Sequence, residues 1–199
     1  MRNIIVCMIF MFVDIGCSSY AVSKYGVSVE NVTALKKWGA SKTSVARFTA
    51  TGESTAEFSC RLVGPVMTPD QKPFEDYIRG ALIDELRVAE FYAEAGPVTL
   101  TGNLDKIDFS STEGTWTLGL TVKSSNGHSI TVSIVHKYES AFVGEKACAL
   151  SAQAFAPAVQ ALIGALVADP GFGALVGAAA GPAVSVNSKR YRPQAAAPR

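Results

Sequence analysis

The chain has 199 residues, of which 48% are hydrophobic and 18% charged, and its formal net charge is +1. This length and composition fit one globular domain with a packed core. The small net charge argues against a general nucleic-acid-binding protein, because binding to the phosphate backbone needs a basic excess. We therefore expect no nucleic-acid partner.

The first residues have the composition of an export signal. Arg2 is followed by an uninterrupted apolar run, Ile4–Val13. A run of this length fits the hydrophobic region of a signal peptide and is too short to cross a bilayer core of about 30 Å as a helix. The sequence predicts that residues 1–16 are a signal peptide and that the protein is exported.

The residues Asp14-Ile15-Gly16-Cys17 resemble the lipobox of bacterial lipoproteins, in which a small residue precedes a cysteine that is acylated and becomes the new N-terminus. The resemblance implies lipidation of Cys17 and attachment to a membrane through the acyl chains. It also implies sorting to the outer membrane, facing the periplasm, because Ser18 follows the cysteine.

A second cleavage site overlaps the first. Ser19-Tyr20-Ala21 has the small-x-small form of an ordinary signal-peptidase site, and Asp14 stands where the lipobox has Leu or Val. Cleavage after Ala21 would discard Cys17 and give a soluble periplasmic or secreted protein that starts at Val22. This alternative stays open at the level of the sequence.

Two of the four cysteines remain for a disulfide bond. Cys7 leaves with the signal peptide and Cys17 is acylated or lost, so that Cys60 and Cys148 remain in an oxidising compartment. A bond between them would close a loop of about 90 residues and contribute about 4–5 kcal/mol through loop-closure entropy. Two separately buried thiols are the alternative. Neither cysteine has a Cys or His at metal-ligand spacing, and we expect no metal site.

The first predicted elements are a short helix and a strand. Ser28 is expected to cap a helix over Val29–Trp38, which ends at Gly39. A strand is predicted over Thr43–Ala50.

A second strand is predicted over Ala56–Val63 and is expected to end at Gly64-Pro65. Phe58, Cys60 and Leu62 would then share one face, and Cys60 would be buried if that face meets the core.

The most pronounced helical pattern covers Pro73–Ala95. Thr68 or Asp70 is expected to cap this helix, and Gly96-Pro97 to end it. The neighbouring acidic residues Asp84 and Glu85 are assigned to its solvent-facing side. Apolar residues recur at steps of three and four along the other side: Phe74, Tyr77, Ile78, Ala81, Leu82, Leu86 and Ala89.

Three strands are predicted next, over Val98–Phe109, Thr115–Lys123 and His128–Tyr138. Gly102 is expected to mark a bulge in the first of them. Asn126-Gly127 predicts a hairpin between the last two. Alternate apolar residues of the central strand share one face: Trp116, Leu118, Leu120 and Val122.

An apolar helix is predicted over Lys146–Ala168, kinked or divided at Pro157. The composition then changes to Gly, Ala and Pro, and residues 176–199 are expected to be a disordered basic tail. After the apolar helix, Gly173, Gly177 and Gly181 recur every four residues. The repeat is interpreted as part of a flexible tail, with self-association or membrane contact as the alternative.

This order of elements predicts an α+β fold, with an antiparallel or mixed sheet and two main helices packed on one face. The predicted divisions are a signal peptide (1–16), a lipid-attachment segment with a short helix (17–42), an α+β domain (43–175) and the tail (176–199). The layout and Cys17 together resemble small α/β outer-membrane lipoproteins that assist envelope assembly or transport, including the lipopolysaccharide-assembly and curli-secretion types. The resemblance implies envelope proteins as partners.

No catalytic arrangement stands out in the sequence. His128 and His136 are its two histidines, the first expected in solvent and the second on the apolar face of a strand. Asp105 and Asp108 are expected on opposite faces and form a poor acid–base pair. We therefore expect a non-enzymatic envelope protein with a structural or protein-interaction role and no cofactor. The alternative is a periplasmic carrier of a lipid or other apolar ligand, with the face of Trp116 lining its pocket.

Overall fold

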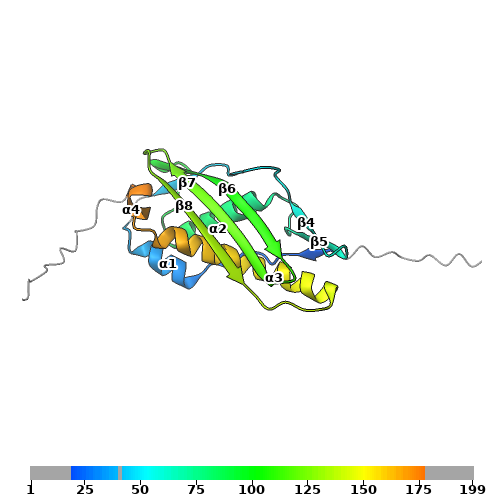
Figure 1. Ribbon diagram of the computed structural model, residues 1–199. Coiled ribbons are helices and arrows are strands. Elements are labelled where there is room, and N and C mark those ends of the chain that lie inside the picture. The colour runs from blue at the N-terminus through cyan, green and yellow to red at the C-terminus, as the bar shows by residue number, and fades with distance from the viewer. Residues whose placement is uncertain (1–18, 40–41, 178–199) are drawn as a thin grey trace, which may run out of the picture.

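A five-stranded sheet lies against a layer of helices, as Figure 1 shows, and a three-stranded sheet adjoins it at one end. The computed structural model describes residues 19–39 and 42–177. The predicted α+β class and mixed sheet are confirmed. The smaller sheet and its N-terminal strand were not predicted.

The main sheet is built on a meander of three antiparallel strands, β6 (Val98–Ser110), β7 (Thr115–Ser124) and β8 (Ser129–Lys137). The predicted hairpin is confirmed, with β7 and β8 in register from end to end. The bulge of β6 lies between Leu104 and Lys106, so its predicted position at Gly102 was wrong.

The single strand predicted over Thr43–Ala50 is two strands, β2 (Thr43–Val45) and β3 (Thr49–Ala50), both parallel to β6. The chain between them leaves the sheet, and Phe48 enters the core. Gly102 makes room for it, because a Cβ atom at this position would lie 2.5 Å from the Phe48 ring. The glycine that suggested a bulge therefore marks a close packing contact.

The smaller sheet contains β1 (Tyr20–Ala21), β5 (Gly64–Met67) and β4 (Glu57–Cys60), in that order. The strand predicted over Ala56–Val63 is present as β4 but ends at Cys60, because the chain reverses at Arg61 and Leu62. These two residues have φ values of 46° and 58°. Gly64-Pro65 begins the next strand, and Leu62 points into solvent instead of sharing the face of Cys60.

Helix α1 (Val29–Lys36) begins as predicted, with the Ser28 side chain accepting a hydrogen bond from the Asn31 backbone. Helix α2 (Phe74–Val88) ends well before the predicted Gly96-Pro97. The chain leaves the helix at Glu90, whose φ is 67°. The predicted caps were also wrong, since the N-cap position is Pro73 and no side chain caps the helix.

Helix α3 (Gly144–Ala168) is continuous through Pro157, so the alternative of two helices was wrong. By length and composition alone, α3 is the one helix among the described residues that could cross a membrane, but 61% of its apolar window is buried inside the fold. It packs on β7 and β8, and α1 packs on it in turn. Helix α3 is therefore the central helix of the core.

Helix α4 (Phe172–Leu175) closes one end of the core with fully buried side chains. A Cβ atom on Gly173 would lie 2.7 Å from the Trp38 ring, so this glycine serves packing between α4 and the end of α1. Gly181 and the rest of the predicted tail beyond residue 177 lie outside the described residues.

Candidate functional site

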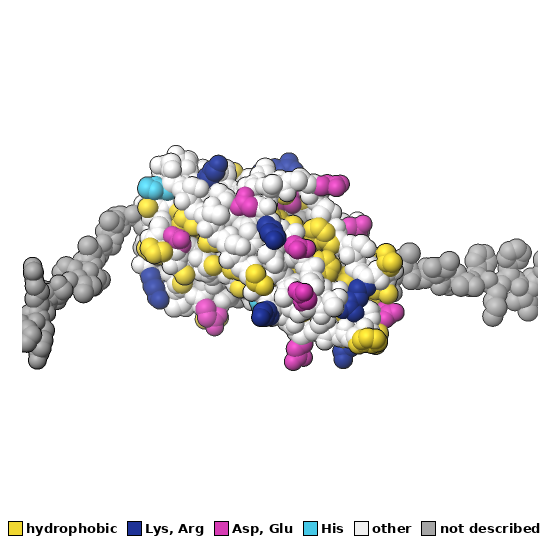
Figure 2. Space-filling view, viewed as in Figure 1, with side chains coloured by type: hydrophobic (Ala, Val, Ile, Leu, Met, Phe, Trp, Pro, Cys, Tyr) yellow, Lys and Arg dark blue, Asp and Glu magenta, His cyan; other side chains and the backbone are white. Residues whose placement is uncertain are grey.

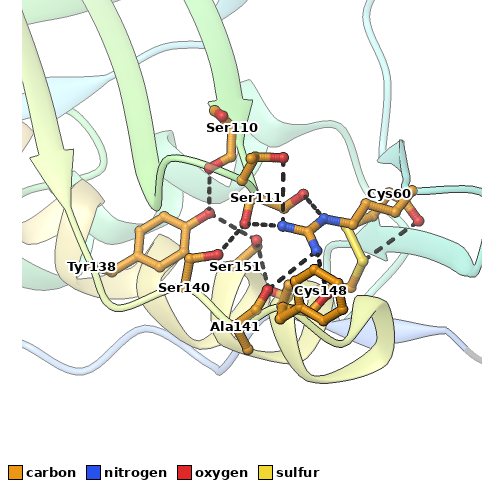
Figure 3. The surroundings of a disulfide bond; sticks show 12 residues. Cys60, Ser110, Ser111, Tyr138, Ser140, Ala141, Cys148 and Ser151 are labelled. Carbon is orange, nitrogen blue, oxygen red and sulfur yellow. Dashed lines mark hydrogen bonds between the residues drawn. A yellow bond between two sulfur atoms is a disulfide. The ribbon is translucent and has the colours of Figure 1, made fainter.

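The disulfide bond predicted between Cys60 and Cys148 is present and joins the end of β4 to the first turns of α3 (Figure 3). The two Cα atoms lie 5.9 Å apart, and both side chains are buried. The predicted lipidation site, Cys17, lies outside the described residues.

Arg61 ties together three loops beside this bond. Its guanidinium group donates hydrogen bonds to the Ser111 carbonyl (2.7 Å) and side chain (3.0 Å) in the β6–β7 turn. It also donates to the carbonyls of Ala141 (3.2 Å) and Phe142 (3.1 Å), between β8 and α3. Because Arg61 itself lies in the β4–β5 turn, the guanidinium and the disulfide bond fix the same end of the domain.

A second polar layer lies beneath Arg61 and reaches the core (Figure 3). The Tyr138 hydroxyl donates to the Ser110 carbonyl at 3.2 Å and lies 2.7 Å from the Ser151 hydroxyl. The indole of Trp116 donates to the Ser151 carbonyl at 2.8 Å. These bonds connect the strand ends to α3, so the loops at this end are held rigidly.

Three large apolar side chains stand in solvent on these held loops. Leu62 is 98% exposed in the β4–β5 turn, while Phe142 is fully exposed and Val143 is 57% exposed before α3. We call these three residues the apolar tip. The β4–β5 turn and the start of α3 lie side by side. A Cβ atom added to Gly144 would be in van der Waals contact with the Val63 side chain, at 3.6 Å.

The chain enters the domain at the same end. Strand β1 is parallel to β5, with Tyr20 opposite Val66. Ser19, the first described residue, therefore lies on the side of Tyr20 that faces Gly64 and the turn that carries Leu62. The smaller sheet places the apolar tip and the N-terminal entry side by side.

A buried carboxyl group holds the segment that follows β1. Glu85 of α2 is fully buried, so its assignment to the solvent-facing side was wrong. Its Oε1 atom accepts hydrogen bonds from the Tyr25 hydroxyl (2.6 Å), the Ser28 backbone (2.8 Å) and the Asn31 side chain (3.3 Å). Within the described residues, the buried Oε2 atom has no hydrogen-bond partner. We call this arrangement the Glu85 junction.

Two tyrosines near the junction have displaced pKa values. Burial, together with the hydrogen bond to Glu85 and the charge of that carboxylate, raises the pKa of Tyr25 far above its ordinary value. Burial raises the pKa of Tyr77 to about 12, and its hydroxyl donates to the Ser23 carbonyl at 2.7 Å. Both phenols stay protonated near neutral pH and act as hydrogen-bond donors.

The structure does not bring the candidate catalytic residues together. His128 is exposed in the β7–β8 turn, whereas His136 is half-buried on β8, opposite Trp116. Burial lowers the pKa of His136. Asp105 accepts hydrogen bonds from Asn103 (2.7 Å) and Thr121 (2.6 Å), as expected of a surface residue.

Among residues 19–39 and 42–177, no group of three His, Cys, Asp or Glu side chains is placed to hold a metal ion. The face of Trp116, the proposed lining of a carrier pocket, is filled by ring contacts. Trp116 is fully buried, 4.7 Å from the Phe109 ring and 4.8 Å from the Phe155 ring between centroids. A groove of about 600 Å³ lies outside the core, beside α2, and carries basic and acidic side chains together, including Lys24, Lys72, Asp76 and Asp84.

Comparison with known proteins relates the chain to others by fold. No family model matches the sequence, and no curated protein matches it. The structure is similar to the crystal structure of protein XCC0632 from Xanthomonas campestris, of the DUF330 family. The TM-score is 0.51 and the sequence identity 14%, and the match covers 75% of this chain and 95% of that one. What the two proteins share is the fold. An uncharacterised bacterial family with this fold agrees with the coarser prediction of a bacterial α/β protein.

Sequence reasoning missed the apolar tip and the Glu85 junction. The tip depends on a reversal at Arg61-Leu62, where neither residue is typical of a tight hairpin turn. One signal for the junction was present. Asn31 belongs to an Asn-x-Thr pattern set within a predicted helix, and the structure buries its side chain between Glu85 and the Gln160 carbonyl.

Proposed function

We propose that this chain is a lipid-anchored protein of the bacterial outer membrane, facing the periplasm, with a non-enzymatic role in protein–protein contact. The Cys60–Cys148 bond carries the export part of the proposal, because disulfide bonds form and persist outside the reducing cytoplasm. The apolar run before Gly16-Cys17 supports the lipid anchor.

The connection between the anchor and the domain also supports this function. One residue separates Cys17 from Ser19, the first described residue, and β1 follows at once. A domain tied this closely to its acyl chains stays at the membrane surface. Durable attachment is expected, since several acyl chains bind a bilayer far more strongly than one does.

A non-enzymatic role agrees with the separation of His128 from His136 and with the surface partners of Asp105. The carrier alternative needs an apolar space between sheet and helices, where the rings of Trp116 and Phe155 already pack. We therefore favour protein contact over ligand carriage. Turnover of a substrate that is lost in His136→Ala would overturn the non-enzymatic role.

The anchor is tested by fractionating cells that express the wild-type chain or Cys17→Ala. We expect the wild-type protein in the outer membrane, and the variant in the soluble periplasmic fraction after cleavage at Ala21. Ser18→Ala is the matched control, because it leaves the cysteine in place and should stay with the membrane. A wild-type protein found soluble, with Val22 as its N-terminus, would contradict the proposal.

A further inference from the structure

The two most exposed side chains of the apolar tip, those of Leu62 and Phe142, do not pack within the fold. Leu62 and Phe142 are almost entirely in solvent, so they add little to the core. Leu62 also takes a left-handed backbone conformation, which disfavours every residue with a side chain and disfavours bulky ones most. Glycine or asparagine would fit this turn better. A contact made by the side chain outside the domain accounts for Leu62 at this position.

The position of the N-terminus indicates what that contact is. Cys17 lies three residues before Tyr20, and an extended chain spans at most about 3.6 Å per residue, so the cysteine lies within about 11 Å of β1. The parallel pairing of β1 with β5 places Ser19, where the described chain begins, at the end of β1 next to the turn that carries Leu62. Acyl chains on Cys17 would therefore enter a bilayer beside the apolar tip.

We propose that the apolar tip inserts into the lipid surface to which Cys17 is anchored, so that the domain stands on the membrane at two points. This inference rests on the lipid anchor proposed above. Leucine, phenylalanine and valine are side chains that partition into the boundary between headgroups and acyl chains, typically about 5–10 Å deep. The far β7–β8 hairpin would then point away from the membrane.

Polar groups lie next to the tip. A hollow of about 640 Å³ next to Phe142 is lined by Arg61, Thr112 and Ser140. When the tip enters the acyl boundary, this cation and these hydroxyls lie at the level of the phosphates. Figure 2 shows hydrophobic side chains among charged ones at the right-hand end of the molecule, where Figure 1 places β4, β5 and the start of α3.

The two loops would insert as one unit. Arg61 donates to the Phe142 carbonyl from the turn that holds Leu62, and the disulfide bond joins the end of β4 to α3. The tip is therefore ordered before it meets lipid, and insertion has little conformational entropy left to lose.

The experiment uses the full acylated protein in vesicles of phosphatidylethanolamine and phosphatidylglycerol. A polarity-sensitive fluorophore is attached to Leu62→Cys or Phe142→Cys, and to His128→Cys as the control. His128 is exposed and lies at the other end of the ten-residue strand β7, about 30 Å away. We expect blue-shifted emission and severalfold quenching by brominated lipid at both tip positions, and water-like emission at the control.

The remaining outcomes overturn the inference in distinguishable ways. Water-like emission at the tip of a protein whose mass confirms acylation would refute insertion and leave the anchor standing. A mass without acyl chains would refute the anchor and the insertion together. A blue shift that appears without vesicles and grows with protein concentration would show a contact between copies of the chain. A second set of variants tests whether the two loops of the tip insert together. With the fluorophore on Val143→Cys, the substitutions Leu62→Ser and Phe142→Ser together should reduce the quenching severalfold.

Discussion

Glu85 is an acidic group in the interior of the fold, and the segment that follows β1 supplies all three donors to its Oε1 atom. Removing a carboxylate from water is costly unless hydrogen bonds replace its hydration. The donors Tyr25, Ser28 and Asn31 are therefore held in one arrangement. This junction fixes the path of the chain between the N-terminal entry and α1.

The junction predicts unequal effects for two neighbouring acidic residues. Glu85→Ala leaves three donors, one buried and two half-buried, without their acceptor and should lower the free energy of unfolding by about 3 kcal/mol. Asp84→Ala removes an exposed ion pair with Arg87 (2.9 Å) and should change it by less than about 0.5 kcal/mol. Urea unfolding of both variants checks this. Equal losses would show that Glu85 does not act as a buried anchor point.

The β4–β5 turn predicts a gain in stability. Leu62→Gly relieves a left-handed conformation at an exposed site and should raise the free energy of unfolding by about 1 kcal/mol. Arg61→Ala is the comparison, because it removes the bonds to Ser111 and Phe142 and should lower stability. A loss of stability in Leu62→Gly would mean that the side chain contributes to the fold, against our interpretation of the tip.

The raised tyrosine pKa values predict weakening at alkaline pH. An unfolded tyrosine ionises near pH 10, whereas the pKa of Tyr77 is raised to about 12. The folded state favours the protonated phenol. The contribution of Tyr77 to the free energy of unfolding is therefore complete below pH 10 and is lost as the pH rises through 12. Unfolding measured across this range should show falling stability. The fall should be shallower in Tyr77→Phe, and an unchanged slope would assign the effect to other groups.

At the scale of elements, the sequence correctly predicted the strands and helices in which the hydrophobic pattern matches the side chains that are buried. Strand β7 alternates between a buried and an open face, so Trp116 and Leu118 were placed correctly. The end of α2 was missed because apolar residues continue past Val88, while a left-handed Glu90 turns the chain. Glu85 was missed because its partners come from a segment about 60 residues earlier, which no local pattern reveals.

Alanine substitutions at two glycines separate the effect of close packing on stability from the effect of helix propensity. Gly102→Ala places a Cβ atom within 2.5 Å of the Phe48 ring, which is itself buried, and should lower the free energy of unfolding by about 2 kcal/mol. Gly80→Ala in the middle of α2 meets no atom within 4 Å and should raise it by about 0.5–1 kcal/mol. Thermal unfolding of the pair checks both signs. A gain for Gly102→Ala would contradict the close contact between β6 and Phe48.

At the scale of the whole molecule, one end of the domain gathers the N-terminal entry, the apolar tip and the disulfide bond. The opposite end carries the β7–β8 hairpin and α4, which touch through the Asn126 side chain and the Ala174 carbonyl (2.8 Å). A lipid anchor at Cys17 would place the end with the apolar tip at the membrane. The hairpin end would then be free to meet a protein partner in the periplasm.

The disulfide bond is expected to stabilise the whole domain. It links residues 88 apart, and replacing both Cys60 and Cys148 by alanine should lower the free energy of unfolding by about 4 kcal/mol through loop-closure entropy. Ser18→Ala is the control, because it keeps Cys17, the disulfide bond and β1, and it should leave the stability of the domain unchanged. Unfolding in denaturant measures both. Equal stability of the double variant and the control would show that the bond does not constrain the unfolded chain.

The central claim, an exported protein anchored through Cys17, is tested most directly by the intact mass of the protein purified from membranes, with and without reduction. The account predicts a chain that starts at Cys17, carries acyl chains, and gains the mass of two hydrogen atoms when the Cys60–Cys148 bond is reduced. A chain that starts at Val22 without lipid would contradict the anchor and, with it, the insertion of the apolar tip.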